Sequence, residues 1–299
     1  MKFEGVYVAT LTPFQKSGAV DAEAFERHLE WLVAAGVQGL VPCGTTGESP
    51  TLSASERVSL IQTCLRLAQG KGVQVIAGCG GNHTEATLEK ILEAEALGCE
   101  GTLVVTPYYN RPTQSGVVAH YEYLADRCAK PIVLYHVPGR TNVPITLETA
   151  KILFQHPRIA ALKEASGQYG YWVGLSEIAQ ETGKTILAGD DDAYAIVQAL
   201  GGRGIISASA NALPEAFVAL YRMMQAGNWP QAFALQKRLF PYVKACFSET
   251  NPAPLKYILH RKGKMENVLR LPLVPVSETT QALLDRAMAR WESEGNRDL

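Results

Sequence analysis

Residues 159–167 read Ile-Ala-Ala-Leu-Lys-Glu-Ala-Ser-Gly, an apolar run that ends in a lysine and a glycine-containing turn. A short apolar run closed in this way predicts a buried β-strand. Lys163 would lie at the carboxyl end of that strand, partly shielded from water. Desolvation disfavours the ammonium form of a lysine, and a neutral amine can attack a carbonyl group to form a Schiff base. Taken alone, the stretch also fits a structural lysine whose amine reaches solvent.

Runs of this kind occur eight times before residue 226, and helical stretches separate them. Eight strand–helix units in succession are typical of a (β/α)8 barrel, also called a TIM barrel. The predicted strands are Val6–Thr10, Gly39–Cys43, Val73–Cys79, Gly101–Thr106, Ile132–His136, Ile159–Lys163, Thr185–Ala188 and Gly204–Ser207.

The intervening helices carry terminal signals. Asp21–Ala35 begins with a residue type that caps helices, Ser53 and Glu56 have the spacing of a capping box, and Gly98 follows Thr84–Leu97 as a C-cap. An open doubly wound sheet is the alternative architecture. Such a sheet usually carries a dinucleotide or phosphate loop, and the chain has neither G-x-G-x-x-G nor a Walker-type pattern.

After residue 213 the strand signals stop, and four further helical stretches follow. We therefore expect a catalytic barrel over residues 1–226 and a C-terminal helical region over residues 227–299. The predicted helices of this last part are Pro214–Ala226, Trp229–Phe247, a stretch near Pro254–Lys262, and Glu278–Glu294.

The composition is that of a protein with a large core, because 47% of the 299 residues are hydrophobic and 19% are charged. A net charge of −1 and the lack of a basic cluster argue against nucleic-acid binding. Residues 1–4 lead directly into the first strand-like run without a signal segment, which predicts a cytoplasmic location. Without a C-x-x-C pair, a zinc site or disulfide framework is not indicated, and we expect six buried free thiols at Cys43, Cys64, Cys79, Cys99, Cys128 and Cys246.

Polar residues follow the carboxyl ends of several predicted strands, which is where barrels of this type carry their chemistry. Lys163 belongs to this face, whereas Lys130 and Lys184 precede their strands and belong to the opposite one. The polar stretches are Gly44-Thr45-Thr46-Gly47-Glu48-Ser49, Pro107-Tyr108-Tyr109-Asn110-Arg111-Pro112, Tyr135-His136-Val137-Pro138-Gly139-Arg140-Thr141 and Gly189-Asp190-Asp191-Asp192.

Each stretch has a structural alternative. Residues 44–49 fit an ordinary turn as well as a nest of N–H groups for a carboxylate, and one of the two tyrosines at 108–109 fits a packing role. Arg140 fits a solvated loop position. Residues 190–192 are expected to cap the next helix rather than to bind a metal. His136 alternates with its neighbour Tyr135, so only one of them faces the barrel centre, and we assign His136 the structural role.

Together these motifs resemble the dihydrodipicolinate synthase and N-acetylneuraminate lyase family of pyruvate-dependent class I aldolases. The match covers essentially the whole chain. The motifs are GTTGES at 44–49, TPYYNRP at 106–112, YHVPGRT at 135–141, KEASG at 163–167, GDD at 189–191 and GIIS at 204–207.

The resemblance implies four catalytic residues. Lys163 would form the Schiff base with pyruvate, and Tyr135 would move protons to and from that imine. Thr45 would connect Tyr135 to Tyr109, whose counterpart in the family reaches across a dimer interface. The family further implies a homotetramer built as a dimer of dimers, and no cofactor beyond the covalent pyruvate imine on Lys163.

The resemblance also implies the binding residues. Thr46, with N–H groups of its loop, would bind the pyruvate carboxylate, and Gly189 and Ile206 would line the pocket. Arg140 would bind the carboxylate of L-aspartate 4-semialdehyde, because a guanidinium fork suits a small substrate with its own carboxylate. This pattern favours the synthase reaction of lysine and diaminopimelate biosynthesis.

Two alternatives remain at this point. One is a sister aldolase that cleaves a 2-keto-3-deoxy sugar acid or 4-hydroxy-2-oxoglutarate with the same lysine and tyrosine. The other is a barrel that only binds 2-oxo acids, and borohydride trapping would separate it from a Schiff-base enzyme.

Regulation by free L-lysine is expected to be weak or absent. Ser49, Asn82 and Tyr108 match the site at which many relatives bind this inhibitor, but the positions of its usual histidines and glutamate hold Ala54, Arg57 and Ala86. Without that carboxylate, the ammonium group of the inhibitor lacks a charge partner. His136, where the family often has asparagine, is a second departure and bears little on the chemistry.

Overall fold

The computed structural model describes residues 3–294. The first two residues of the predicted barrel region, 1–2, and the last five of the predicted C-terminal region, 295–299, lie outside the described residues. Eight parallel strands form a closed barrel in sequence order, with β8 hydrogen-bonded to β1. This confirms the predicted (β/α)8 architecture. The strands are β1 (Gly5–Ala9), β2 (Gly39–Val41), β3 (Gln74–Gly78), β4 (Gly101–Val105), β5 (Ile132–His136), β6 (Ile159–Glu164), β7 (Thr185–Ala188) and β8 (Gly204–Ser207).

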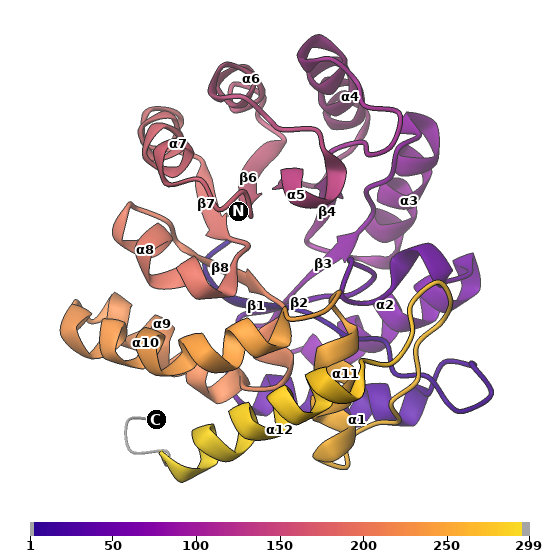
Figure 1. Ribbon diagram of the computed structural model, residues 1–299. Helices are drawn as coiled ribbons and strands as arrows, with labels where there is room; N and C mark the ends of the chain where they lie inside the picture. Colours follow the sequence, from indigo (N-terminus) through magenta and orange to yellow (C-terminus); the bar gives the residue numbers. More distant parts are fainter. Residues whose placement is uncertain (1–2, 295–299) are drawn as a thin grey trace.

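Helices surround the barrel, and the last helices gather on one side of it (Figure 1). The α-helices are α1 (Ala22–Ala34), α2 (Ala54–Ala68), α3 (Thr84–Leu97), α4 (Gln114–Arg127), α5 (Pro138–Thr141), α6 (Leu147–Leu153), α7 (Tyr169–Thr182), α8 (Tyr194–Ala199), α9 (Pro214–Gln225), α10 (Trp229–Cys246), α11 (Ala253–Arg261) and α12 (Glu278–Ser293). Short 3₁₀ turns lie at η1 (Ser49–Thr51), η2 (Asp191–Ala193) and η3 (Ser209–Asn211).

All eight predicted strands are present, and their ends differ by at most two residues. β2 stops at Val41 rather than at Cys43, because Cys43 has a left-handed backbone with φ of 59° and cannot continue a strand. β6 runs one residue further than predicted, because Glu164 pairs with His136 of β5.

The predicted helix caps are also confirmed. The Asp21 side chain accepts a hydrogen bond from Ala24 N–H at the start of α1, and Ser53 and Glu56 form both bonds of a capping box on α2. Gly98 ends α3 in the left-handed conformation, with φ of 105°. Such caps satisfy backbone groups that a helix terminus would otherwise leave unpaired.

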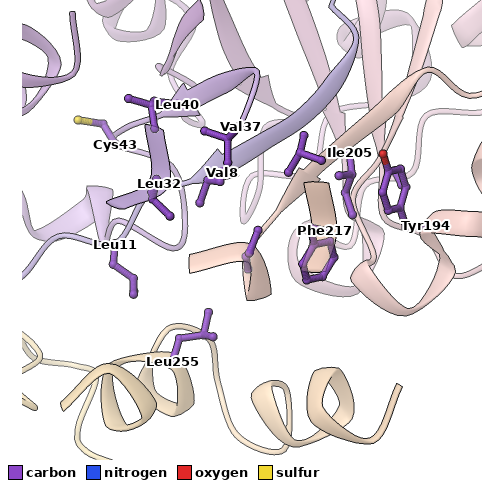
Figure 2. Close-up of a cluster of buried hydrophobic side chains, with 14 of the residues drawn as sticks. Val8, Leu11, Leu32, Val37, Leu40, Cys43, Tyr194, Ile205, Phe217 and Leu255 are labelled. Carbon is purple, nitrogen blue, oxygen red and sulfur yellow. The ribbon is translucent and has the colours of Figure 1, made fainter. Parts of the chain in front are cut away.

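The core has two layers, because alternate residues of each strand point to opposite faces. Inside the barrel, one cluster contains Tyr7, Val41, Leu103 and Ile206. Outside it, a larger cluster fills the space between strands and helices. Figure 2 shows part of this outer layer, where Val8 of β1 and Leu40 of β2 lie with Leu32, Phe217 and Leu255 of helices α1, α9 and α11.

Helices α10, α11 and α12 pack on one another, and α10 also contacts α8 and α9. Leu255 of α11 is fully buried in the core that covers the barrel. Within residues 3–294, no helix combines the length and apolar character that crossing a membrane requires. All six cysteines are buried and carry free thiols, as predicted.

Candidate active site

A cavity of about 140 Å³ lies at the carboxyl ends of the strands. Its wall contains six of the eight residues that the motifs singled out, and it adds residues from the end of α10 and the segment before α11. The lining residues are Ala9, Gly44, Thr45, Thr46, Leu103, Tyr135, Val137, Arg140, Lys163, Ala165, Gly189, Asp190, Ala208, Phe247 and Asn251. A space of this size suits a small acid rather than a nucleotide.

Lys163 and Tyr135 occupy the same level of neighbouring strands, because Tyr135 of β5 pairs with Lys163 of β6. The lysine is 6% exposed and the tyrosine 8%. The Lys163 Nζ lies 4.3 Å from the centre of the Tyr135 ring. An amine nucleophile and a phenol that can donate or accept a proton are thus side by side in a site largely closed to water.

Behind this pair, the next residues of the two strands point outward and form a buried brace. His136 Nδ1 lies 2.6 Å from a Glu164 carboxylate oxygen. The same carboxylate accepts hydrogen bonds from Trp172 Nε1 and from Ser166 N–H. His136 therefore lies outside the barrel centre, as the alternation predicted, and the brace fixes the relative height of β5 and β6. Sequence reasoning did not single out Glu164.

The loop over residues 44–49 turns tightly above β2. Gly47 N–H donates to Gly44 O and Glu48 N–H donates to Thr45 O, whereas no hydrogen bond within the described residues occupies the N–H groups of Thr45 and Thr46. Thr46 is 3% exposed. Two free N–H groups beside two hydroxyls are what a carboxylate-binding nest requires.

Arg140 lies on the short helix α5 and is exposed at the rim of the cavity. A guanidinium there can form two parallel hydrogen bonds with a carboxylate at the mouth of the cavity.

Gly189 follows β7 where the chain passes close to β6. A side chain at this position would meet Glu164 O and the Ala165 side chain, each at 2.8 Å. Because Gly189 has no side chain, its backbone can lie directly in the cavity wall.

Asp190 occupies the N-cap position of η2, and Asp191 and Asp192 lie in its first turn, as the predicted capping role implies, but the Asp190 side chain forms no cap hydrogen bond. Asp191 is buried and accepts a hydrogen bond from Ser209 N–H at 2.7 Å, and Asp192 lies 3.7 Å from Lys244 Nζ. Asp190 lines the cavity, and burial, together with the charges of Asp192 and Asp191, raises its pKa to about 7. Its carboxyl group is therefore partly protonated at neutral pH.

Two motif residues lie outside the lining. Ile206 is buried in the inner barrel cluster below the cavity. Tyr109 is 89% exposed and has a left-handed backbone, with φ of 71°. Within residues 3–294 it forms no hydrogen bond with Thr45 or Tyr135, so a single chain does not complete that connection.

Phe247 and Asn251 were missed by sequence reasoning, although both line the cavity. They lie between α10 and α11, far along the chain from the motifs. In the part of the chain that the structure describes, no three His, Cys, Asp or Glu side chains gather to hold a metal ion.

Comparisons with known proteins agree with this geometry. The model of the dihydrodipicolinate synthetase family matches residues 2–290. The 4-hydroxy-tetrahydrodipicolinate synthase of Thermodesulfovibrio yellowstonii is 42% identical over 284 residues, which cover 94% of this chain and 96% of that protein.

Solved structures match as closely. The dihydrodipicolinate synthase of Thermotoga maritima is 39% identical, with a TM-score of 0.95 over 97% of this chain and 99% of that one. The chloride-inhibited dihydrodipicolinate synthase of Acinetobacter baumannii, complexed with pyruvate, is 35% identical, with a TM-score of 0.93 over 96% and 98% of the two chains. The family match spans nearly all of the chain and confirms the resemblance of its motifs, and this chain belongs to the dihydrodipicolinate synthetase family.

Proposed function

We propose that the protein condenses pyruvate with L-aspartate 4-semialdehyde to form 4-hydroxy-tetrahydrodipicolinate, a step of lysine and diaminopimelate biosynthesis. The observation that carries this proposal is the pairing of Lys163 with Tyr135 in one cavity that also presents Thr46 and Arg140. The inner groups suit a 2-oxo acid, and the rim arginine suits a second substrate with a carboxylate. The pyruvate complex of the A. baumannii relative supports the first assignment.

The reaction begins when the Lys163 amine attacks the carbonyl carbon of pyruvate and water leaves. The resulting imine carries a positive charge and acts as the electron sink, so the chemistry requires no metal or organic cofactor. Tyr135 takes a methyl proton to give the enamine, and Thr45 lines the cavity beside it. Thr46 and its loop hold the carboxylate, and Gly189 and Ile206 support the pocket.

The enamine carbon then attacks the aldehyde carbon of the semialdehyde, and the aldehyde oxygen takes up a proton. The amino group of the second substrate attacks the imine carbon, closes the ring and releases the Lys163 amine. Arg140 holds the second carboxylate throughout. One carbon–carbon bond and one carbon–nitrogen bond form, and one water is lost overall.

We further propose a cytoplasmic homo-oligomer, a tetramer assembled as a dimer of dimers. The exposed Tyr109 side chain supports this assignment. Its backbone is left-handed, and within residues 3–294 the side chain does not reach Thr45 or Tyr135 of the same chain. In a dimer it would approach Thr45 of the neighbouring subunit and complete the proton path to Tyr135.

The test is turnover of purified protein with both substrates, coupled to the reductase that consumes the product. Efficient turnover supports the proposal. A well-folded protein without turnover would overturn it, and cleavage of 2-keto-3-deoxy acids would then be assayed.

Arg140→Ala is expected to lower kcat/KM for the semialdehyde by about 100-fold, because it removes a charge-assisted hydrogen-bonding pair. Pyruvate imine formation should be preserved, since Arg140 lies at the rim. Steady-state kinetics and borohydride trapping measure the two effects. Arg158→Ala, at the amino end of β6, is the matched control and should match the unaltered enzyme. Equal loss of both activities in Arg140→Ala would contradict the assigned role.

L-Lysine is expected to inhibit weakly or not at all. Ala54, Arg57 and Ala86 border a surface pocket of about 330 Å³, and the buried Arg57 guanidinium donates to Gly78 O at 3.0 Å. A fixed cation there disfavours an incoming ammonium group. Initial rates across a range of L-lysine concentrations provide the measurement, and complete inhibition below millimolar L-lysine would refute the prediction.

A further inference from the structure

Asn251 lies at the junction between the C-terminal helices and the active-site cavity. It is 6% exposed, lines the cavity and precedes α11. Its Nδ2 donates a hydrogen bond to Thr46 Oγ1 at 2.9 Å. The two residues are far apart in the chain, so this contact is purely tertiary.

This hydrogen bond determines the direction in which the Thr46 hydroxyl can donate its own proton. A hydroxyl has one proton to donate and two lone pairs that accept. Because Oγ1 accepts from Asn251, its own proton points elsewhere, and no group within residues 3–294 accepts it. Thr46 lines the cavity, so the available partner for that proton is a ligand there.

A second contact joins the same two segments. Two residues beyond Thr46, the Glu48 carboxylate lies 2.5 Å from Nζ of Lys256 in α11, and both side chains are fully buried. Glu48 has a left-handed backbone, with φ of 54°, a conformation that persists only where its surroundings enforce it. Its other carboxylate oxygen accepts from Arg270 N–H at 3.0 Å. The loop is thus held from the C-terminal side at two points.

We propose that Asn251 is a positioning residue that turns the Thr46 hydroxyl into a fixed donor for the pyruvate carboxylate, with the Glu48–Lys256 pair holding the two segments in register. This inference rests on the proposed function, because it takes pyruvate as the inner ligand. It assigns the C-terminal helices a part in substrate recognition. Asn251 itself acts through Thr46.

The experiment compares Asn251→Ala and Asn251→Asp by two readouts. One is the pyruvate concentration that gives half-maximal borohydride trapping on Lys163, measured by mass spectrometry without the second substrate. The other is the split between KM and kcat in steady state. Asn251→Ala should raise the pyruvate half-saturation about tenfold, the effect of losing one oriented hydrogen bond. Asn251→Asp should raise it further, because a carboxylate accepts the Thr46 proton and repels the substrate. The kcat at saturating pyruvate and the KM for semialdehyde should change less than pyruvate binding does.

A double-mutant cycle separates positioning from general loosening of the site. Thr46→Val should weaken pyruvate binding at least as much as Asn251→Ala, and Asn251→Ala should add nothing in the Thr46→Val background. Ser277→Ala is the control, because it removes the N-cap of α12 and so lowers stability in the same region without touching the cavity.

Three results would overturn the inference: an Asn251→Ala curve that overlies that of the unaltered enzyme, an Asn251→Asp variant that binds pyruvate as well as Asn251→Ala, or additive effects in the cycle. These results leave the proposed function intact. An unaltered enzyme that traps no pyruvate adduct would overturn the proposed function itself, and the inference with it.

Discussion

Replacing Lys163 with alanine is expected to abolish borohydride trapping of pyruvate and to lower kcat by at least about 10⁴-fold. The proposed reaction has a covalent intermediate at this amine, and removal of a nucleophile leaves only binding and orientation to accelerate the chemistry. The variant should fold normally, because within residues 3–294 the Lys163 Nζ packs over the Tyr135 ring and belongs to no hydrogen bond or salt bridge. Mass spectrometry after reduction and the coupled assay provide the measurements.

Lys184→Ala is the matched control for this result. Lys184 precedes β7 at the opposite end of the barrel, where its Nζ donates to His156 O at 2.9 Å. Adduct formation and kcat should be unchanged in this variant. An adduct that persists in Lys163→Ala would show that another amine is the nucleophile, and loss of the adduct in Lys184→Ala would show that trapping reports on folding.

Most of the barrel could be predicted from the sequence, because its determinants are local. Buried parallel strands are short apolar runs, and each was detectable without knowledge of its partners. The end of the barrel that carries the candidate active site could also be predicted, because a residue's place before or after a strand assigns it to one end. Lys163 ends a strand, whereas Lys184 precedes one. The alternation of Tyr135 and His136 then separated the residue that faces the cavity from the one that braces the strands.

The features that escaped prediction depend on contacts between distant segments. Asp191 was expected to cap a helix, yet its carboxylate turns toward Ser209 N–H because the loop after β8 lies against it. Asn251 and Phe247 lie in a helical region without any motif that points to a site. The left-handed conformations of Glu48 and Tyr109 likewise have no local signal, because neither residue type favours them.

Lys256→Met is expected to lower the free energy of unfolding by about 3–5 kcal/mol. The substitution keeps much of the side-chain volume but leaves the Glu48 carboxylate buried without its cation, and breaking one side of a buried ion pair has an effect of this size. Burial lowers the pKa of Lys256 to about 8, and the neighbouring Glu48 carboxylate opposes that shift. Chemical denaturation at pH 7 measures the change.

The double variant Glu48→Gln with Lys256→Met tests the cause of that loss. An uncharged pair removes the unpaired buried carboxylate, so we expect it to recover most of the stability. Lys262→Met is the matched control: this half-buried lysine at the end of α11 donates to Ala212 O at 3.1 Å, and its loss should cost about 1 kcal/mol.

If Lys256→Met were no more destabilising than Lys262→Met, the Glu48–Lys256 contact would contribute little. If the double variant were as unstable as Lys256→Met, the loss would come from packing or from the bond between Lys256 Nζ and Val268 O. Recovery of stability together with weakened pyruvate trapping would show that the charge pair holds the Thr46 loop in place beyond its contribution to the fold.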